Sequence, residues 1–195
     1  MGAAITTKDT PVNETAKFAL NPTTKVFTDD GREVQPGSGE TGMVANGGLV
    51  PSGYYKDPEK SARTFREVNG VRYGFAGDMA TIAADGTLVL LGRGSNCINT
   101  GGEKVFPEEV EEALKEHPAV EDALIFGVPD DRFGQRVVGV VSLSPGQDAS
   151  ADDIVADART RLSSYKLPRE LRLVDLCPRT PSGKPNYSAA KELFG

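Results

Sequence analysis

The clearest helical pattern of the chain lies between Pro107 and His117. Its apolar positions Val110, Ala113 and Leu114 follow the i, i+3, i+4 spacing of one helix face, so this face is expected to pack against another element. Proline suits the first turn of a helix because its missing N–H would have no intrahelical partner there. The glutamates of this segment are expected to form an exposed face, and those near the start also gain from the helix dipole. They are Glu108, Glu109, Glu111 and Glu112.

Strand and helix patterns alternate after this helix. Ser150-Ala151-Asp152-Asp153 resembles a capping box, which predicts a helix over residues 154–162. The alternation predicts a small α/β domain in the second half of the chain, with a short sheet flanked by helices. Its other expected elements are strands at 123–128, 136–143 and 171–176, and a short helix at 189–193.

The first half of the chain has short apolar runs separated by glycine and proline, which predicts strands and turns. The strongest turn signal is Asp85-Gly86, between apolar stretches at 79–83 and 87–91, and it predicts a β-hairpin. Further elements expected here are strands at 26–27, 33–34 and 43–45, and a helix at 58–65.

These patterns together predict an α+β chain with two domains. The β-rich part is expected over residues 1–92, and the small α/β domain over residues 93–195. The boundary is placed at Gly92-Arg93-Gly94-Ser95, where two glycines loosen the backbone between a hairpin and the next unit.

Composition narrows the class of partner. The 195 residues include 22 Lys and Arg against 28 Asp and Glu, a formal net charge of −6. Nucleic acid and anionic membrane surfaces demand a basic face, so neither is expected as the main partner. The longest aliphatic run, residues 88–91, is too short for a transmembrane helix, and the first residues lack the features of a signal peptide. We therefore expect a cytoplasmic protein.

The residues around several familiar motifs do not fit the sites that these motifs usually indicate. Residues 37–42 fit G-x-G-x-x-G, but a short apolar run follows where a dinucleotide site needs a helix, so we interpret them as a surface turn. His117 stands alone, without a set of neighbouring ligands, which argues against a metal site. Cys97 and Cys177 are too few for a disulfide framework and are expected to be buried or inert thiols.

Four segments carry candidate chemistry. Taken singly, Asp78 could be a turn cap, and Arg93 and Lys184 could be solvated surface charges. Taken together, the order and spacing of the four segments resemble those of a known superfamily, and this resemblance favours functional roles. The segments are FAGD at 75–78, GRGSNCINTGGEKVFPEEVE at 92–111, LSSYKLP at 162–168 and PRTPSGK at 178–184.

These four blocks, together with GYYKDPEKSARTF at 53–65, resemble the C-terminal part of the adenylate-forming superfamily of acyl-CoA synthetases, aryl-CoA ligases, luciferase and peptide-synthetase adenylation domains. The resemblance spans nearly the whole chain. Residues 92–115 are most similar to bacterial fatty-acid or steroid-side-chain CoA ligases. It implies a distorted, barrel-like end of a large AMP-binding domain over residues 1–92, and a mobile C-terminal domain over residues 93–195.

The resemblance also implies a two-step reaction. A carboxylate attacks the α-phosphate of ATP to give acyl-AMP and pyrophosphate, and the thiol of CoA then displaces AMP. Lys184 would be the adenylation lysine, whose ammonium meets the charge that builds up on the phosphate. Asp78 would accept hydrogen bonds from the ribose hydroxyls, and Arg93 would hold the ribose or the phosphate. Mg²⁺ is implied as well, with its ligands expected upstream and no metal ligands in this chain.

Two further functional segments follow from the resemblance. Arg93, Gly94 and Ser95 would form the hinge about which the small domain swings between the two steps. The loop that approaches CoA in the second step would consist of Asn99, Gly101, Gly102, Glu103 and Lys104.

This sequence departs from the family pattern at several of these positions. Ser95 stands where Asp or Lys is usual, and Ala76 where Thr is common. Asn99 occupies the usual lysine position, whereas Lys104 occupies one often held by Gln, so the positive charge is expected to have moved.

The upstream phosphate loop and the acidic block of a complete enzyme have no counterpart in this sequence. We therefore expect the chain to be the C-terminal piece of a longer ligase, inactive without its N-terminal domain, whose exposed apolar strands could self-associate. The substrates would be a fatty or steroid-type carboxylic acid, ATP and CoA. Two alternatives remain open: a stand-alone, non-catalytic module that binds AMP or CoA or another protein, and an adenylation domain that serves a carrier protein.

Overall fold

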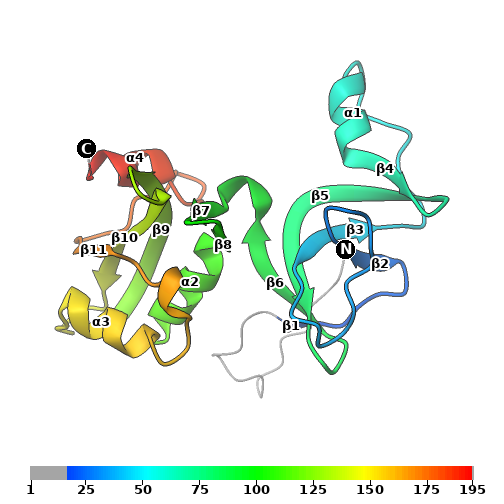
Figure 1. The fold of residues 1–195 in the computed structure, drawn as a ribbon. Coiled ribbons are helices and arrows are strands. Elements are labelled where there is room, and N and C mark those ends of the chain that lie inside the picture. The colour runs from blue at the N-terminus through cyan, green and yellow to red at the C-terminus, as the bar shows by residue number, and fades with distance from the viewer. Residues whose placement is uncertain (1–16, 195) are drawn as a thin grey trace. The chain divides into compact units, whose positions relative to one another are not determined.

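The computed structural model describes residues 17–194 and consists of two compact units, Met1–Ser95 and Asn96–Gly195 (Figure 1). The N-terminal segment that lacks signal-peptide features lies outside the described residues. Within them, no helix is long and apolar enough to cross a membrane. The units divide three residues beyond Gly92. The strand β6 (Leu88–Arg93) continues one residue past this glycine, and a short 3₁₀ turn, η1 (Gly94–Asn96), follows it.

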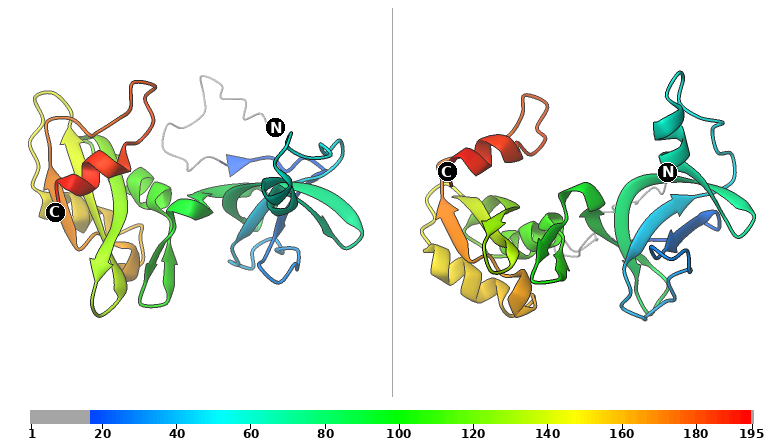
Figure 2. Two further views of the ribbon diagram at one scale, coloured as in Figure 1. Left: turned by 90° about the horizontal axis from the view of Figure 1, so that it is seen from above. Right: turned by 45° about the horizontal axis from the view of Figure 1, so that its top comes forward.

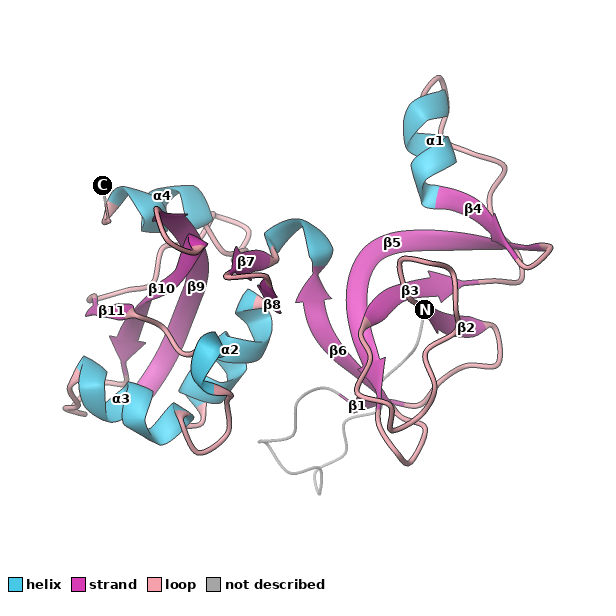
Figure 3. Cartoon of the chain, viewed as in Figure 1, coloured by secondary structure: helices cyan, strands magenta, loops and turns pink. Residues whose placement is uncertain are grey.

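Antiparallel strands dominate the first unit (Figure 3). The long strand β5 curls through the unit and pairs with β6, β3 and β4 along its length (Figure 1). The sheet order is β1-β6-β5-β3-β2, with β4 also on β5. The elements are β1 (Lys17–Phe18), β2 (Thr24–Phe27), β3 (Gly42–Asn46), α1 (Pro58–Thr64), β4 (Phe65–Val68), β5 (Val71–Ile82) and β6 (Leu88–Arg93).

The predicted hairpin at Asp85-Gly86 is confirmed. Gly86 has a φ of +83°, which glycine adopts without strain, and its N–H donates to the carbonyl of Ala83 at 2.9 Å. Residues 33–34 lie antiparallel to 26–27, as predicted, but form only an isolated bridge between Phe27 and Glu33 and not a regular strand. The Val34 N–H donates to the Val26 carbonyl at 2.9 Å. The G-x-G-x-x-G segment is a turn followed by β3, as predicted, and no helix follows it.

The second unit is built around β10, which pairs antiparallel with β9 and parallel with β11. The hairpin β7–β8 joins the start of β10. The helix α3 begins at Ala151 rather than residue 154, and its predicted capping box between Ser150 and Asp153 is confirmed. The elements are β7 (Ile98–Thr100), β8 (Glu103–Val105), α2 (Pro107–Lys115), β9 (Val120–Asp130), β10 (Gly134–Leu143), α3 (Ala151–Ala158), η2 (Ser164–Lys166), β11 (Glu170–Leu173) and α4 (Tyr187–Glu192).

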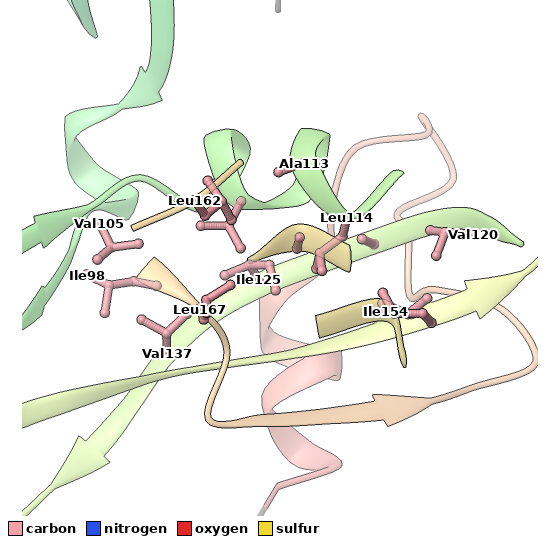
Figure 4. Close-up of a cluster of buried hydrophobic side chains, with 14 residues drawn as sticks. Ile98, Val105, Ala113, Leu114, Val120, Ile125, Val137, Ile154, Leu162 and Leu167 are labelled. Carbon is pink, nitrogen blue, oxygen red and sulfur yellow. The ribbon is translucent and has the colours of Figure 1, made fainter. Parts of the chain in front are cut away.

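Apolar side chains are buried on both faces of this second sheet, which accounts for the nearly continuous apolar runs of β9 and β10. On one face, Ile125 and Val137 pack with Leu114 of α2 and Ile154 of α3 (Figure 4). On the other face, the core includes Ala190 of α4, which lies across the sheet (Figure 2). The predicted short sheet flanked by helices is confirmed.

Candidate functional site

Asp78 and Arg93 lie opposite each other on the paired strands β5 and β6. Arg93 Nε is 3.4 Å from Asp78 Oδ1, and the side chains are 65% and 36% exposed. Asp78 was expected just before a strand, but it lies inside β5, because this strand begins at Val71. Ion pairs this exposed contribute little to stability, so the pair has little structural value and is accessible to a ligand.

The backbone around this pair is bent. Gly77 has a φ of +91° and Gly92 a φ of +131°, and no atom lies within 4 Å of a Cβ built on Gly77. Glycine is therefore required at position 77 by the backbone conformation and not by lack of space. The strand register shifts between Met79 and Ala80. Such an irregularity redirects the neighbouring side chains, here those of Asp78 and Arg93.

The predicted CoA loop is the β7–β8 hairpin. Its turn consists of Gly101 and Gly102, whose φ values of +60° and +90° match a type I′ turn. Asn99 pairs directly with Lys104 across the ladder. Paired residues point to the same face of a sheet, so the side chains of Lys104 and Asn99 leave the hairpin on the same face. Glu103 is exposed beside the turn.

The tip of this hairpin is held by a residue that sequence reasoning missed. The N–H of Gly101 donates to the carbonyl of Phe133 at 3.0 Å, and a Cβ at Gly101 would lie 3.1 Å from the Phe133 ring. The N–H of Asn99 donates to Gln135 Oε1 at 2.9 Å. Phe133 lies just before β10, and Gln135 is the second residue of this strand. Both are far from the hairpin in sequence, so only the folded sheet brings them to it.

Lys184 lies at the end of a tight turn over residues 180–183. Pro181 occupies the second position of the turn, which its fixed φ favours, and Gly183 has a φ of +78°. The Thr180 N–H donates to the Lys184 carbonyl, and the Lys184 N–H to Thr180 Oγ1, at 2.8 and 3.2 Å. The Lys184 side chain is exposed and, within residues 17–194, forms no ion pair with a carboxylate.

A second pair that sequence reasoning missed joins this turn to the sheet. The Arg179 guanidinium donates two hydrogen bonds to Asp122 of β9, at 2.7 and 2.6 Å. Burial alone would raise the pKa of the Asp122 carboxyl, but the hydrogen bonds and charge of Arg179 outweigh it and lower this pKa.

Of the four glutamates expected to form an exposed face of α2, Glu112 is exposed, whereas Glu108 and Glu109 are half-buried. The expectation fails most clearly for Glu111, which is 7% exposed. Its Oε1 accepts hydrogen bonds from the Ile125 N–H at 2.8 Å and from the Tyr187 hydroxyl at 3.3 Å. Burial raises the pKa of Glu111 to about 7, and burial together with this carboxyl raises the pKa of Tyr187. The helical turn that was interpreted as a solvated face therefore meets β9 and α4.

The 162–168 block serves packing in this structure. Leu162 and Leu167 are buried in the core that α2 and α3 cover. Lys166 Nζ lies 2.6 Å from Glu109 Oε1, with both side chains largely buried.

The two cysteines are also removed from solvent to different extents. Cys177 is fully buried and Cys97 is half-buried, and burial raises the pKa of both thiols.

The acidic residues that the structure describes do not assemble a metal site. Within residues 17–194, no three His, Cys, Asp or Glu side chains come together in a way that could hold a metal ion. The described residues therefore do not fit Mg²⁺.

Known proteins with similar sequences include enzymes of one kind, CoA ligases. Residues 109–184 match the AMP-binding enzyme C-terminal domain. The chain is 53% identical over 176 residues to the 3-oxocholest-4-en-26-oate–CoA ligase of Rhodococcus rhodochrous, covering 90% of this chain and 32% of that protein. It is 54% identical over 176 residues to the medium/long-chain-fatty-acid–CoA/3-oxocholest-4-en-26-oate–CoA ligase of Mycobacterium tuberculosis H37Rv, with the same coverage.

Solved structures of related synthetases have the same fold over most of this chain. The amide bond synthetase McbA of Marinactinospora thermotolerans is 30% identical with a TM-score of 0.77, covering 89% of this chain and 35% of that one. The o-succinylbenzoate CoA synthetase MenE of Bacillus subtilis, in complex with its acyl-adenylate, is 28% identical with a TM-score of 0.72, covering 89% and 34%. The chain thus spans about a third of the length of the relatives it matches.

Proposed function

Since the chain corresponds to the C-terminal part of an adenylate-forming acyl-CoA synthetase, we propose that it serves the ATP-dependent ligation of a carboxylic acid to CoA. In the first step the carboxylate oxygen attacks the α-phosphorus of ATP, and pyrophosphate leaves. In the second step the CoA sulfur attacks the acyl carbon, AMP leaves, and the thiol proton is lost. The products are acyl-CoA, AMP and pyrophosphate.

Lys184 is the residue to which we assign the first step. The observation that carries this assignment is an exposed amine, on a turn closed by its own hydrogen bonds, with no carboxylate partner among residues 17–194. Such an amine can donate hydrogen bonds to the α-phosphate and the attacking carboxylate as negative charge builds up between them.

Asp78 and Arg93 are assigned to the nucleotide. The Asp78 carboxylate offers two acceptor oxygens, which suit a pair of vicinal ribose hydroxyls. The neighbouring guanidinium of Arg93 can itself donate hydrogen bonds to the ribose or the phosphate.

The β7–β8 hairpin is assigned to the second step. Gly101 and Gly102 are exposed, and a Cβ built on Gly102 would have open space around it, so a narrow chain such as pantetheine can approach the backbone there. Lys104 supplies the positive charge that relatives in this family usually have at the position of Asn99, its neighbour across the ladder. Arg93, Gly94 and Ser95 would be the hinge about which residues 93–195 move between the two steps.

The substrate class follows from the relatives. Because both bacterial ligases above are named for 3-oxocholest-4-en-26-oate, and one also for medium and long-chain fatty acids, we propose an acid of these two kinds. Mg²⁺ would be held by residues outside this chain, and we place the reaction in the cytoplasm, which supplies ATP and CoA. Two thirds of such a ligase lie outside this chain, so we expect the chain alone to be inactive.

A graft tests this function. We would replace the matching C-terminal third of the Rhodococcus rhodochrous ligase with this chain, and measure ATP–pyrophosphate exchange with 3-oxocholest-4-en-26-oate. The Lys184→Ala graft should lose a factor of about 10²–10³ in exchange, by analogy with the loss of one oxyanion donor. The Lys191→Ala graft, which removes an exposed lysine of α4, is the matched control and should keep the wild-type rate.

Two results would contradict the assignment. One is a Lys184→Ala graft with the wild-type exchange rate. The other is exchange above background by the chain alone. An inactive graft, together with AMP or CoA binding by the chain in calorimetry, would instead support the non-catalytic module.

A further inference from the structure

The turn that carries Lys184 is held to its unit in an unusual way. From Pro181 to Lys184 every residue is exposed, so no apolar packing fixes the direction of the turn. Its backbone hydrogen bonds join Thr180 to Lys184 and Asn186 to Pro178, and therefore close the segment only on itself. Something outside the segment must orient it.

The Arg179 side chain provides this link. Its Nε and Nη2 donate to the two carboxylate oxygens of Asp122, and its Nη1 donates to the carbonyl of Gly183 at 3.0 Å. Asp122 is only 18% exposed and belongs to β9, which pairs with β10 along its length. A single guanidinium thus joins a rigid strand to the peptide group directly before Lys184.

A second contact holds the other side of the segment. Tyr187, the first residue of α4, donates its hydroxyl to Glu111, which in turn accepts from the N–H of Ile125 in β9. Lys184 therefore lies between two side-chain anchors, Arg179 before it and Tyr187 after it. Only the Arg179 anchor touches the turn itself.

We propose that Arg179, paired with Asp122, is a positioning residue that sets the direction of Lys184 for the adenylation step; this inference rests on the proposed function. A lysine side chain has a flexible stem, so the place of its amine depends on how firmly its backbone is held. Reacting groups must be held within about 0.5 Å of their productive geometry. Lysine at position 179 would keep the charge, but one ammonium cannot reproduce the three directed hydrogen bonds of the guanidinium.

The first test uses the chain itself. In the Arg179→Lys variant, amide hydrogen exchange at Thr180 and Lys184 should be faster by about tenfold, as expected for the loss of charge-assisted hydrogen bonds. Amides of β9 and β10 should keep their wild-type rates. The control is Arg136→Lys, which alters an Arg–Glu pair of similar exposure on β10, with Glu170 at 3.0 Å.

The second test separates positioning from a merely structural role. In the graft described above, Arg179→Lys should lower kcat of ATP–pyrophosphate exchange by between about tenfold and about a hundredfold, with KM for ATP changed by less than about twofold. Thioester formation from added acyl-AMP should stay at the wild-type rate, because Lys184 is assigned to the first step alone. Asp122→Asn should give the same selective loss, and is the second variant if Arg179→Lys does not fold.

Each outcome decides between the alternatives. Equal loss of both half-reactions, or no loss of either, would overturn the positioning role. If Lys184→Ala is inactive in exchange while Arg179→Lys and Asp122→Asn match wild type, only this inference fails. If Lys184→Ala retains full exchange, the proposed role of Lys184 fails, and the inference fails with it.

Discussion

At the scale of single residues, the sharpest contrast is between two acidic side chains of the second unit, Glu111, which accepts a hydrogen bond from β9, and Asp122, which belongs to β9. Glu111 and Asp122 are both largely buried, yet their pKa values move in opposite directions. Asp122 faces a guanidinium, whereas Glu111 accepts only neutral hydrogen bonds, from Ile125 and Tyr187, which do not offset the loss of hydration. The partner, more than the burial, decides which form is stable.

This difference predicts a pH dependence of stability. The pKa of Glu111 rises from its ordinary 4.5 to about 7 on folding, so the folded state holds its proton more tightly. The stabilisation is complete below pH 4.5 and is lost as pH rises to about 7, a decrease of about 3 kcal/mol in the free energy of unfolding. Urea titrations at pH 5 and pH 8 should show this decrease.

Glu111→Gln isolates the effect, because glutamine keeps the shape but has no charge to bury. The variant should lose most of the decrease between pH 5 and pH 8 while retaining the fold. Glu112→Gln, an exposed neighbour on the same helix, is the control and should keep the wild-type pH dependence. A variant at position 111 with an unchanged pH profile would contradict the prediction.

At the scale of elements, β9 and β10 pack most closely at Gly139 of β10, which has no side chain and pairs with Ile125 of β9. A Cβ built on Gly139 of β10 would lie 2.4 Å from Ile125 Cδ1 and 2.8 Å from the Leu124 carbonyl. The Leu124 carbonyl oxygen belongs to the backbone of β9 and cannot move away without shifting the strand pair. Gly139 is thus part of the packing between the strand and its neighbour.

Gly139→Ala should therefore lower the free energy of unfolding of the second unit by about 1–3 kcal/mol, through overpacking. Gly74→Ala is the matched control: Gly74 also lies in a strand, but a Cβ there would be 3.6 Å from the Phe65 ring, an ordinary contact. It should change stability by less than about 0.5 kcal/mol. Thermal or urea unfolding of both variants measures the difference, and equal effects would count against the steric explanation.

At the scale of the molecule, the second unit has a core of its own on both faces of its sheet. With about 100 residues it is above the size at which domains need disulfides or metals to fold. We therefore expect residues 96–195, expressed alone, to fold cooperatively. Amide NMR peaks of β9 and β10 should coincide with those of the whole chain, and collapsed, undispersed spectra would show that this core is insufficient.

Local patterns were enough to predict most helices, most strands and the Asp85-Gly86 hairpin. Residues 92–111 show the limit: the part before the predicted helix was interpreted as a loop, but it contains β7 and β8. Their apolar positions are too few for a visible alternation, and the hairpin depends on Phe133 and Gln135 far along the chain. Short strands of this kind form because of their partners.

The sequence by itself determined the element types and the two-unit organisation, because periodicity and turn chemistry are local properties of the chain. It indicated Asp78, Arg93 and Lys184 as candidates through the resemblance of its motifs to the adenylate-forming superfamily. Only the tertiary structure decided that Glu111 is buried and that Arg179 meets Asp122. These partners come from elements that are distant in sequence, and the packing of α2, β9 and α4 selects them. Burial and pairing of charges are long-range properties, which no local pattern contains.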